Sequence, residues 1–255
     1  MYIAQLARDL PSVPGLLQCL WPWPDEPRDC CCVATRFSWG ADCLDRPAGP
    51  DIDIPPWIAR AAPRRRAEYI AGRCCAGEAL RRLTGKTTFP GQAEDRAPVW
   101  PRGTIGSISH SGDVAIAVAG SSARYCGLGV DIEKPLTEAE AREIAPQALT
   151  ERELQRLRTP ADAFLIGLTF SAKESLFKAL YPTVRRYFGF HASQLVTWNP
   201  AGTGLLSLTR DLSPEWRRGQ EIPLHFCCLE NFVATRVSIE WADRQVDRAS
   251  RYELY

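Results

Sequence analysis

The pattern of hydrophobic and polar positions predicts helices and strands in the first half of the chain. In residues 64–83, RRRAEYIAGRCCAGEALRRL, apolar side chains recur near helical spacing, which predicts a helix with basic ends. Residues 30–39 have the composition of a strand. The segment TIGSISHSGDVAIAVAG, residues 104–120, predicts a strand, a turn rich in Ser, His and Gly, and a second strand.

The second half begins with a predicted strand and continues with helices. Residues 136–158 form a charged amphipathic pattern that Pro146 should break, with Thr150 as a new N-cap and Glu153 completing a capping box. Residues 161–181 predict a long helix that ends at Pro182. Strands are expected at 196–200 and 204–210, followed by a hairpin over 224–241.

The strand at GLGVDIEKP, residues 127–135, places two carboxylates together. Residues of the same parity share one face of a strand, so Asp131 and Glu133 lie side by side. A third carboxylate from a helix would complete a one-sided Mg²⁺ site with room for water and phosphate oxygens. The alternative is a solvent-facing strand of an antiparallel sheet with two exposed carboxylates.

The predicted helix at 161–181 has a stripe of small and charged residues on an otherwise apolar surface. Gly167, Ser171, Glu174 and Lys178 follow one another at helical spacing. Such a stripe is typical of a pocket wall. An ordinary surface Glu–Lys pair, worth about 0.3 kcal/mol, is the alternative.

Two further segments offer groups that bind anions. In GSISHSG, residues 106–112, small residues, Ser hydroxyls and His110 suit phosphate. One alternative is a turn histidine that caps backbone groups. A Ser–His hydrolase is another, but this segment lacks the G-x-S-x-G turn that presents the serine nucleophile in such enzymes. Arg65, Arg66 and Arg73 have the planar fork that fits phosphate, although arginines on this helix also suit a solvated face.

Composition limits the classes of function. The 255 residues have a net charge of +1 and no apolar run of membrane-spanning length, so neither nucleic acid nor a membrane is an expected partner. The N-terminus lacks the apolar core of a signal peptide, which predicts a cytoplasmic protein. Most of the ten cysteines are in runs of adjacent residues rather than C-x-x-C pairs, so we expect reduced thiols packed as small hydrophobes.

Taken together, GVDIE and FSAKESLFKALYP resemble the paired signatures of the 4′-phosphopantetheinyl transferases. The upstream RRRAEYIAGR and APVWPRGTIGSISHSG and the downstream RRYFGF are similar to the enterobactin-synthetase type. These matches span residues 64–190, about half the chain.

The resemblance implies an α+β fold with two pseudo-dimeric lobes, each a small antiparallel sheet packed on a helix. The lobes would be residues 1–122, with the contacts to coenzyme A phosphates, and residues 123–255, with the metal site and the catalytic helix. It also implies transfer of phosphopantetheine from coenzyme A to a serine of an acyl or peptidyl carrier protein, for example in siderophore or polyketide synthesis, with release of 3′,5′-ADP. We expect a monomer, because a chain with two lobes needs no partner to build its cleft.

The resemblance also assigns roles to individual residues. Asp131, Glu133 and Glu174 would hold Mg²⁺, with Glu174 also the base for the carrier serine. Lys178 would stabilise phosphate charge. Coenzyme A phosphates would contact four residues: Arg65, Arg73, Ser109 and His110. A loop after the catalytic helix would meet the acidic carrier protein through Arg185, Arg186, Tyr187 and Phe188.

Two departures and two alternatives accompany this assignment. Some relatives have a phosphate-binding lysine near Gln92, where this chain offers only Lys86 or Arg96 nearby, and Phe170 stands where many relatives have Trp. A Mg²⁺-dependent phosphohydrolase would also use clustered carboxylates. A non-catalytic coenzyme A-binding module would keep the Arg and His contacts without needing Glu174.

Overall fold

The computed structural model describes residues 15–39, 52–159 and 162–242. The chain divides into two compact units. Of the described residues, the N-terminal unit comprises 15–21, 27–39, 52–128 and 238–242, and the C-terminal unit comprises 22–26, 129–159 and 162–237. The division passes through one strand between Leu128 and Gly129. The lobe boundary expected at residue 122 lies in the turn before that strand and stays a prediction.

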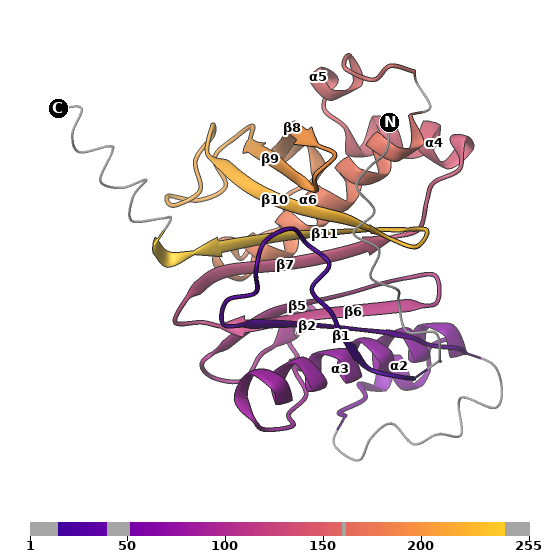
Figure 1. The fold of residues 1–255 in the computed structure, drawn as a ribbon, viewed down its shortest axis with the longest axis vertical. Helices are drawn as coiled ribbons and strands as arrows, with labels where there is room; N and C mark the ends of the chain where they lie inside the picture. The colour runs from indigo at the N-terminus through magenta and orange to yellow at the C-terminus, as the bar shows by residue number, and fades with distance from the viewer. Residues whose placement is uncertain (1–14, 40–51, 160–161, 243–255) are drawn as a thin grey trace. The chain divides into compact units, whose positions relative to one another are not determined.

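The N-terminal unit is an antiparallel sheet covered by a long helix. The sheet has the strand order β1-β2-β6-β5 and α3 lies along it, as Figure 1 shows. Its elements are β1 (Gln18–Cys19), β2 (Cys30–Arg36), α2 (Pro56–Ala59), α3 (Pro63–Thr84), β3 (Gly91–Gln92), β4 (Pro98–Val99), β5 (Thr104–Ser111) and β6 (Val114–Ser121).

The C-terminal unit contains most of a second sheet together with the remaining helices. This sheet has the order β7-β11-β10-β9-β8. Its elements are β7 (Tyr125–Glu133), α4 (Glu138–Ala148), α5 (Glu151–Leu154), α6 (Ala163–Val184), the 3₁₀ turn η1 (Phe190–Ala192), β8 (Ser193–Asn199), β9 (Thr203–Leu208), β10 (Glu221–Leu229) and β11 (Phe232–Glu240). The α+β class expected from the sequence is therefore confirmed.

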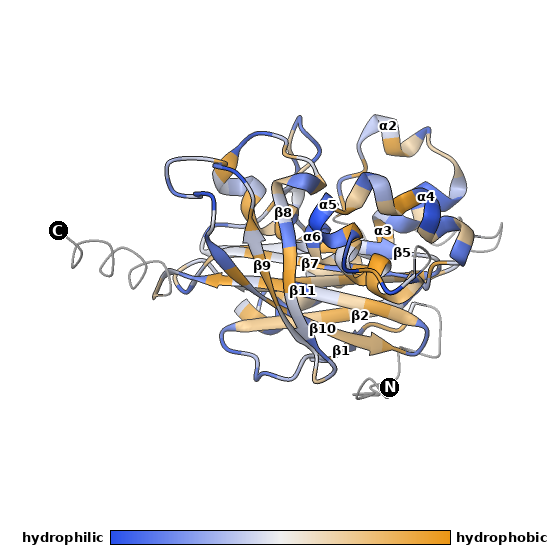
Figure 2. Cartoon of the chain, turned by 90° about the horizontal axis from the view of Figure 1, so that it is seen from above, coloured by the Kyte–Doolittle hydropathy of each residue, from blue (hydrophilic) through white to orange (hydrophobic). Residues whose placement is uncertain are grey.

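Small and medium apolar side chains fill the two cores. In the N-terminal unit, alanines, Cys75 and Leu80 of α3 pack on Val33 of β2 and on the alternate alanines 115, 117 and 119 of β6. In the C-terminal unit, Ile166 of α6 packs on the alanines of α4. Figure 2 shows a long hydrophobic stretch along β2. None of the described helices is both long and apolar enough to cross a bilayer.

The structure corrects three expectations about where elements end. Ser109 and His110 lie within β5, and the turn after β5 is made by Gly112 and Asp113. Pro146 lies inside α4, which continues to Ala148. Pro182 lies inside α6, which ends at Val184 because the next residue adopts a left-handed conformation. A proline near the end of a helix removes one hydrogen bond without forcing the chain to turn at once.

Candidate active site

Asp131 is buried at the centre of the C-terminal unit. Every residue of β7 before Glu133 is buried, so both faces of the strand are covered there, and Asp131 is 2% exposed. The solvent-facing strand considered above is therefore wrong for Asp131. The reason is Gly129, where an added Cβ would lie 1.9 Å from the carbonyl oxygen of Ser175 on α6. Only glycine lets α6 approach the β7 backbone this closely.

Two residues of α6 neutralise and orient the Asp131 carboxylate. The Lys178 ammonium lies 2.6 Å from Oδ1 and also donates to the Val130 carbonyl at 3.3 Å. The Ser171 hydroxyl donates to Oδ2 at 2.8 Å. Both residues belong to the stripe predicted on this helix, and the stripe faces β7.

Glu174 lies on the same stripe, in the field of both charges. Burial raises the pKa of its carboxyl, the Lys178 ammonium counteracts this, and the Asp131 carboxylate adds to it. Glu133 is half-buried at the end of β7. Within the residues that the structure describes, no three side chains of His, Cys, Asp or Glu are grouped to hold a metal ion. The structure thus brings Asp131, Glu174 and Lys178 together, without a preformed triad of carboxylates.

A chain of buried hydroxyls supports Asp131 from behind. Thr235 of β11 shares a hydrogen bond of 2.9 Å with the Ser171 hydroxyl and one of 2.7 Å with the Ser175 hydroxyl. Because the Ser171 hydroxyl donates its proton to Asp131, the Thr235 hydroxyl is the donor to Ser171 and shares its one proton between the Ser171 hydroxyl and the Ser171 carbonyl. Thr235 therefore links β11 to α6 at the level of the carboxylate. All three hydroxyl side chains are fully buried. Nothing in the sequence analysis singled out Thr235.

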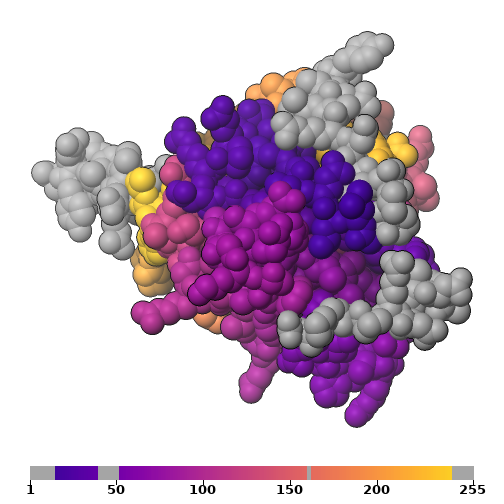
Figure 3. Space-filling view, turned by 60° about the horizontal axis from the view of Figure 1, so that its bottom comes forward, coloured from indigo at the N-terminus to yellow at the C-terminus, as the bar shows by residue number. Residues whose placement is uncertain are grey.

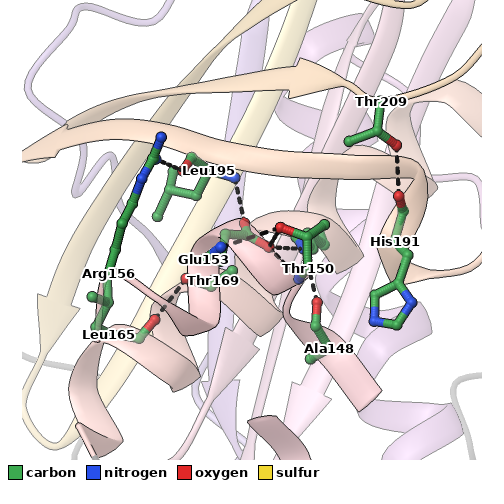
Figure 4. A network of polar contacts seen from close by, with 10 residues as sticks. Ala148, Thr150, Glu153, Arg156, Leu165, Thr169, His191, Leu195 and Thr209 are labelled. Atoms are coloured by element: carbon green, nitrogen blue, oxygen red, sulfur yellow. Dashed lines mark hydrogen bonds and ion pairs between the residues drawn. The ribbon is translucent and has the colours of Figure 1, made fainter. Parts of the chain in front are cut away.

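A second buried ion pair lies one residue before Glu174. The Lys173 ammonium is 2.6 Å from Glu153 and donates to the Ala148 carbonyl at 2.8 Å. Figure 4 shows the Glu153 carboxylate as the centre of a network, where it accepts hydrogen bonds from Thr150 and from the Leu195 amide. The network ties α4, α5 and β8 to α6. The capping box of Thr150 and Glu153 expected from the sequence is confirmed, but the ion pair was not foreseen.

A pocket of about 260 Å³ opens beside Glu174. Its wall contains Lys173, Glu174 and Phe177 of α6 and three aromatic residues after that helix: Tyr187, Phe188 and Phe190. Tyr187 is 78% exposed, whereas Phe188 is 6% exposed and packs on Phe177.

The N-terminal unit contains a separate cluster of basic residues on α3 and β5. Arg65 Nη1 lies 2.8 Å from His110 Nε2 and 3.1 Å from a Glu68 oxygen, and His110 Nδ1 is 3.8 Å from the same carboxylate. An arginine can only donate, so Nε2 is the acceptor in this arrangement and Nδ1 has the proton. Ser109, the residue before His110, is buried. Arg65 and His110 are brought together from 45 residues apart in sequence.

Arg73 and Arg96 differ in how accessible they are. Arg73 is 6% exposed, stacks on Tyr69 and donates to the Gly91 carbonyl at 3.3 Å, and burial lowers its pKa. Arg96 lies over the Trp57 ring at 4.7 Å, and Arg65 approaches the same ring at 5.9 Å. Trp57 thus joins these two arginines, and no local pattern in the sequence indicated it.

Two family models match this chain. Residues 55–120 match the model of the 4′-phosphopantetheinyl transferase N-terminal domain, and residues 127–237 match the 4′-phosphopantetheinyl transferase superfamily. Enterobactin synthase component D of Escherichia coli K12 is 34% identical over 172 residues, which are 67% of this chain and 80% of that protein. This chain belongs to the 4′-phosphopantetheinyl transferase family. The first matched segment lies within the N-terminal unit, and the second covers residues 127 and 128 together with most of the C-terminal unit.

Two further relatives match less of the chain. Enterobactin synthase component D of Salmonella typhimurium is 42% identical over 48% of this chain, and the match spans about half, 51%, of that relative's length. A 4′-phosphopantetheinyl transferase of Nocardia iowensis is 33% identical over 54% of this chain and 62% of its own length. Relatives named as enterobactin synthase component D and relatives named as 4′-phosphopantetheinyl transferases therefore both match this chain.

Proposed function

We propose that this transferase moves the 4′-phosphopantetheine group from coenzyme A to a serine hydroxyl of an apo acyl or peptidyl carrier protein. The observation that supports this most directly is the buried Asp131, held by Lys178 and Ser171, with Glu174 beside it on the same helix stripe. In this reaction the serine oxygen forms a bond to the phosphorus that bears pantetheine. The bond from that phosphorus to the second phosphate breaks, and 3′,5′-ADP leaves.

Glu174 is the proposed base for the serine proton. A general base works best when its pKa lies nearer the working pH than that of a free carboxyl. In the metal-free protein, burial and the Asp131 charge shift the pKa of Glu174 in that direction, whereas a bound Mg²⁺ would lower it. Lys178 has a half-buried ammonium that can stabilise charge on the transferred phosphate. Its bond to Asp131 fixes the ammonium in one place.

The residues around Asp131 fit a magnesium ion. The donors are carboxylate oxygens, which suit a small hard cation. In addition, burial raises the pKa of Glu174 and repulsion from the Asp131 carboxylate adds to it. A bound cation would relieve that repulsion. Asp131, Glu133 and Glu174 are the proposed ligands. When bound, Mg²⁺ would neutralise charge on the pyrophosphate of coenzyme A.

The basic cluster of the N-terminal unit is the proposed binding site for coenzyme A phosphates. Arg65 and His110 have accessible side chains, 45% and 29% exposed, and Ser109 lies next to His110 on β5. Buried Arg73 adds positive charge from the same helix. Of the two substitutes for the lysine near Gln92, we favour Arg96, since it shares the Trp57 ring with Arg65. Lys86 instead follows the end of α3.

The proposed docking surface for the carrier protein follows α6. Arg185, Arg186 and Tyr187 are exposed, and the two arginines would attract an acidic partner. Phe188 does not belong to this surface, because it is buried against Phe177. Of the two aromatic residues expected to contact the carrier, only Tyr187 is therefore placed on this surface.

Mass spectrometry of an apo carrier protein incubated with this protein, coenzyme A and Mg²⁺ tests the proposal. The expected result is one phosphopantetheine increment on the carrier. A phosphohydrolase would cleave coenzyme A without modifying the carrier, and a binding module would leave both unchanged. Glu174→Gln keeps the size of the side chain but removes the base, so single-turnover transfer should fall about 10²–10⁴-fold. Coenzyme A binding by calorimetry should weaken only a few-fold. An equal loss of both would make Glu174 a ligand only.

A further inference from the structure

Cys19 and Cys31 form a close pair of thiols in the N-terminal unit. Their sulfur atoms lie 3.5 Å apart. In the antiparallel pairing of β1 and β2, Cys19 lies opposite Val33, so Cys31 is its diagonal neighbour on the same face of the sheet. The nine described cysteines are all thiols, with no disulfide among them. This pair joins two separate cysteine positions of the sequence, which spacing along the chain did not indicate.

The two thiols differ in accessibility. Cys19 is exposed, and the segment 15–39 that contains it is visible as indigo atoms on the surface in Figure 3. Cys31 is partly buried and packs against the core around Val33. Burial, together with the neighbouring Cys19 sulfur, raises the pKa of the Cys31 thiol to about 12. An exposed thiol beside a buried one gives an order of reaction, in which the exposed sulfur reacts first.

We propose that Cys19 and Cys31 form an intramolecular disulfide by exchange with a small-molecule disulfide such as oxidised glutathione. The Cys19 thiolate attacks one sulfur of that disulfide, which forms a mixed disulfide and releases one small thiol. Cys31 then loses its proton and attacks the Cys19 sulfur, which forms the Cys19–Cys31 bond and releases the second small thiol. Two protein thiols are oxidised, and the small disulfide is reduced to two thiols.

The local structure allows the sulfurs to close the remaining gap. A disulfide needs a sulfur–sulfur distance of about 2.05 Å, so the pair must approach by roughly 1.5 Å. β1 is a two-residue edge strand, and beyond its ladder its segment is bonded to β2 through Gly15 N to Arg36 O, Leu20 N to Cys32 O and Thr35 Oγ1 to Leu16 O. A short strand at the edge of a sheet can shift by this distance. The disulfide would fasten this strand covalently to β2.

The pair lies away from the residues proposed for coenzyme A. In the sheet order β1-β2-β6-β5, β1 is one edge and β5, with Ser109 and His110, is the opposite edge. Oxidation of the pair should therefore leave transfer activity unchanged. Disulfide formation and transfer activity are thus independent properties, and a test of one can fail without affecting the other.

Trypsin separates the two cysteines, since it cleaves after Arg28 and releases them in the peptides 9–28 and 29–36. The full chain would be incubated with oxidised glutathione, alkylated, digested and analysed by tandem mass spectrometry. A Cys43→Ser background removes the one cysteine outside the described residues. The expected product is peptide 9–28 linked to peptide 29–36 through Cys31.

Three variants in that background decide the outcome. Cys31→Ser should leave Cys19 as a stable mixed disulfide with glutathione, and Cys19→Ser should abolish the linked peptide. Cys74→Ser, a change at another partly buried thiol, should leave the linked peptide unchanged. Slower amide exchange over residues 15–20 after oxidation should accompany the link. A mixed disulfide that persists at Cys19 while Cys31 is present, or a link through another cysteine, would overturn the proposal.

Discussion

Lys178 Nζ lies 2.6 Å from Asp131 Oδ1, while the Ser171 hydroxyl donates to the other oxygen of the same carboxylate. The two contacts reach from α6 to β7 and satisfy a carboxylate that is almost fully buried. Asp131 is therefore part of the packing of this unit as well as a proposed metal ligand. A change at Asp131 must affect stability even when no metal is bound.

Asp131→Ala should abolish transfer and lower the melting temperature of the metal-free protein. The variant leaves the Lys178 ammonium and the Ser171 hydroxyl without their acceptor, at a cost of about 1–3 kcal/mol. Two adjacent carboxylates considered alone would predict the opposite, because removing one relieves repulsion. Glu133→Ala, at a half-buried position, is the control and should cost less. A higher melting temperature for Asp131→Ala would show that repulsion dominates.

Gly129→Ala should destabilise the protein by about 1–3 kcal/mol through overpacking. The added methyl group would lie 1.9 Å from the Ser175 carbonyl oxygen and 2.7 Å from the Ala179 nitrogen, so α6 has to move away from β7. The matched control is Gly189→Ala, where no atom lies within 4 Å and the backbone φ of −79° suits alanine. Urea unfolding of both variants checks this prediction, which equal losses of stability would contradict.

Lys173→Met should lower the free energy of unfolding by about 3–5 kcal/mol, because it leaves the buried Glu153 carboxylate without its ammonium. Adding Glu153→Gln removes that uncompensated charge. The double variant should thus be more stable than Lys173→Met alone. A double-mutant cycle by urea unfolding measures this coupling. Additive effects would mean that the two charges stabilise the fold independently.

His225 should make stability depend on pH. Burial and the nearby Arg236 guanidinium lower the pKa of its ring in the folded protein, while an unfolded histidine titrates near 6.5. Below about pH 6.5 the unfolded chain therefore binds a proton that the folded chain does not, and stability falls as the pH falls. His225→Asn keeps an acceptor for Arg236 but does not titrate. Its unfolding free energy, measured from pH 5 to 8, should vary less than that of the wild type, and an equal slope would exclude His225 as the cause.

Charge reversal on the proposed docking surface should act on the carrier protein alone. Arg185→Glu together with Arg186→Glu should raise the KM for an acidic carrier protein and spare the KM for coenzyme A, since both residues are exposed beyond the end of α6. The matched control reverses two exposed charges elsewhere in the same unit, Arg142→Glu with Arg152→Glu. If the control raises the carrier KM equally, net charge and not this surface is responsible.

Local signals in the sequence were sufficient for the long helices, the main strands and one of the caps, but not for the short elements β1, α2, β3 and β4. Helical spacing at 64–83 and 161–181 predicted α3 and α6, and the Thr150–Glu153 box marked the start of α5. The ends of helices were predicted less well. Pro146 and Pro182 each remove one backbone hydrogen bond, but neither determines the residue at which its helix ends. The family resemblance also came from motifs that are short and contiguous, and family comparison confirmed it.

The sequence by itself determined the α+β class and the transferase family. It also determined that Ser171, Glu174 and Lys178 lie on one face of a helix. Side-chain periodicity states which residues share a face, but it does not state what covers that face. Only the tertiary structure decided that Asp131 is buried and paired, that Lys173 meets Glu153 and that Cys19 meets Cys31. Each of these contacts joins residues from different elements, and such contacts depend on how helices and strands pack, which no local pattern encodes.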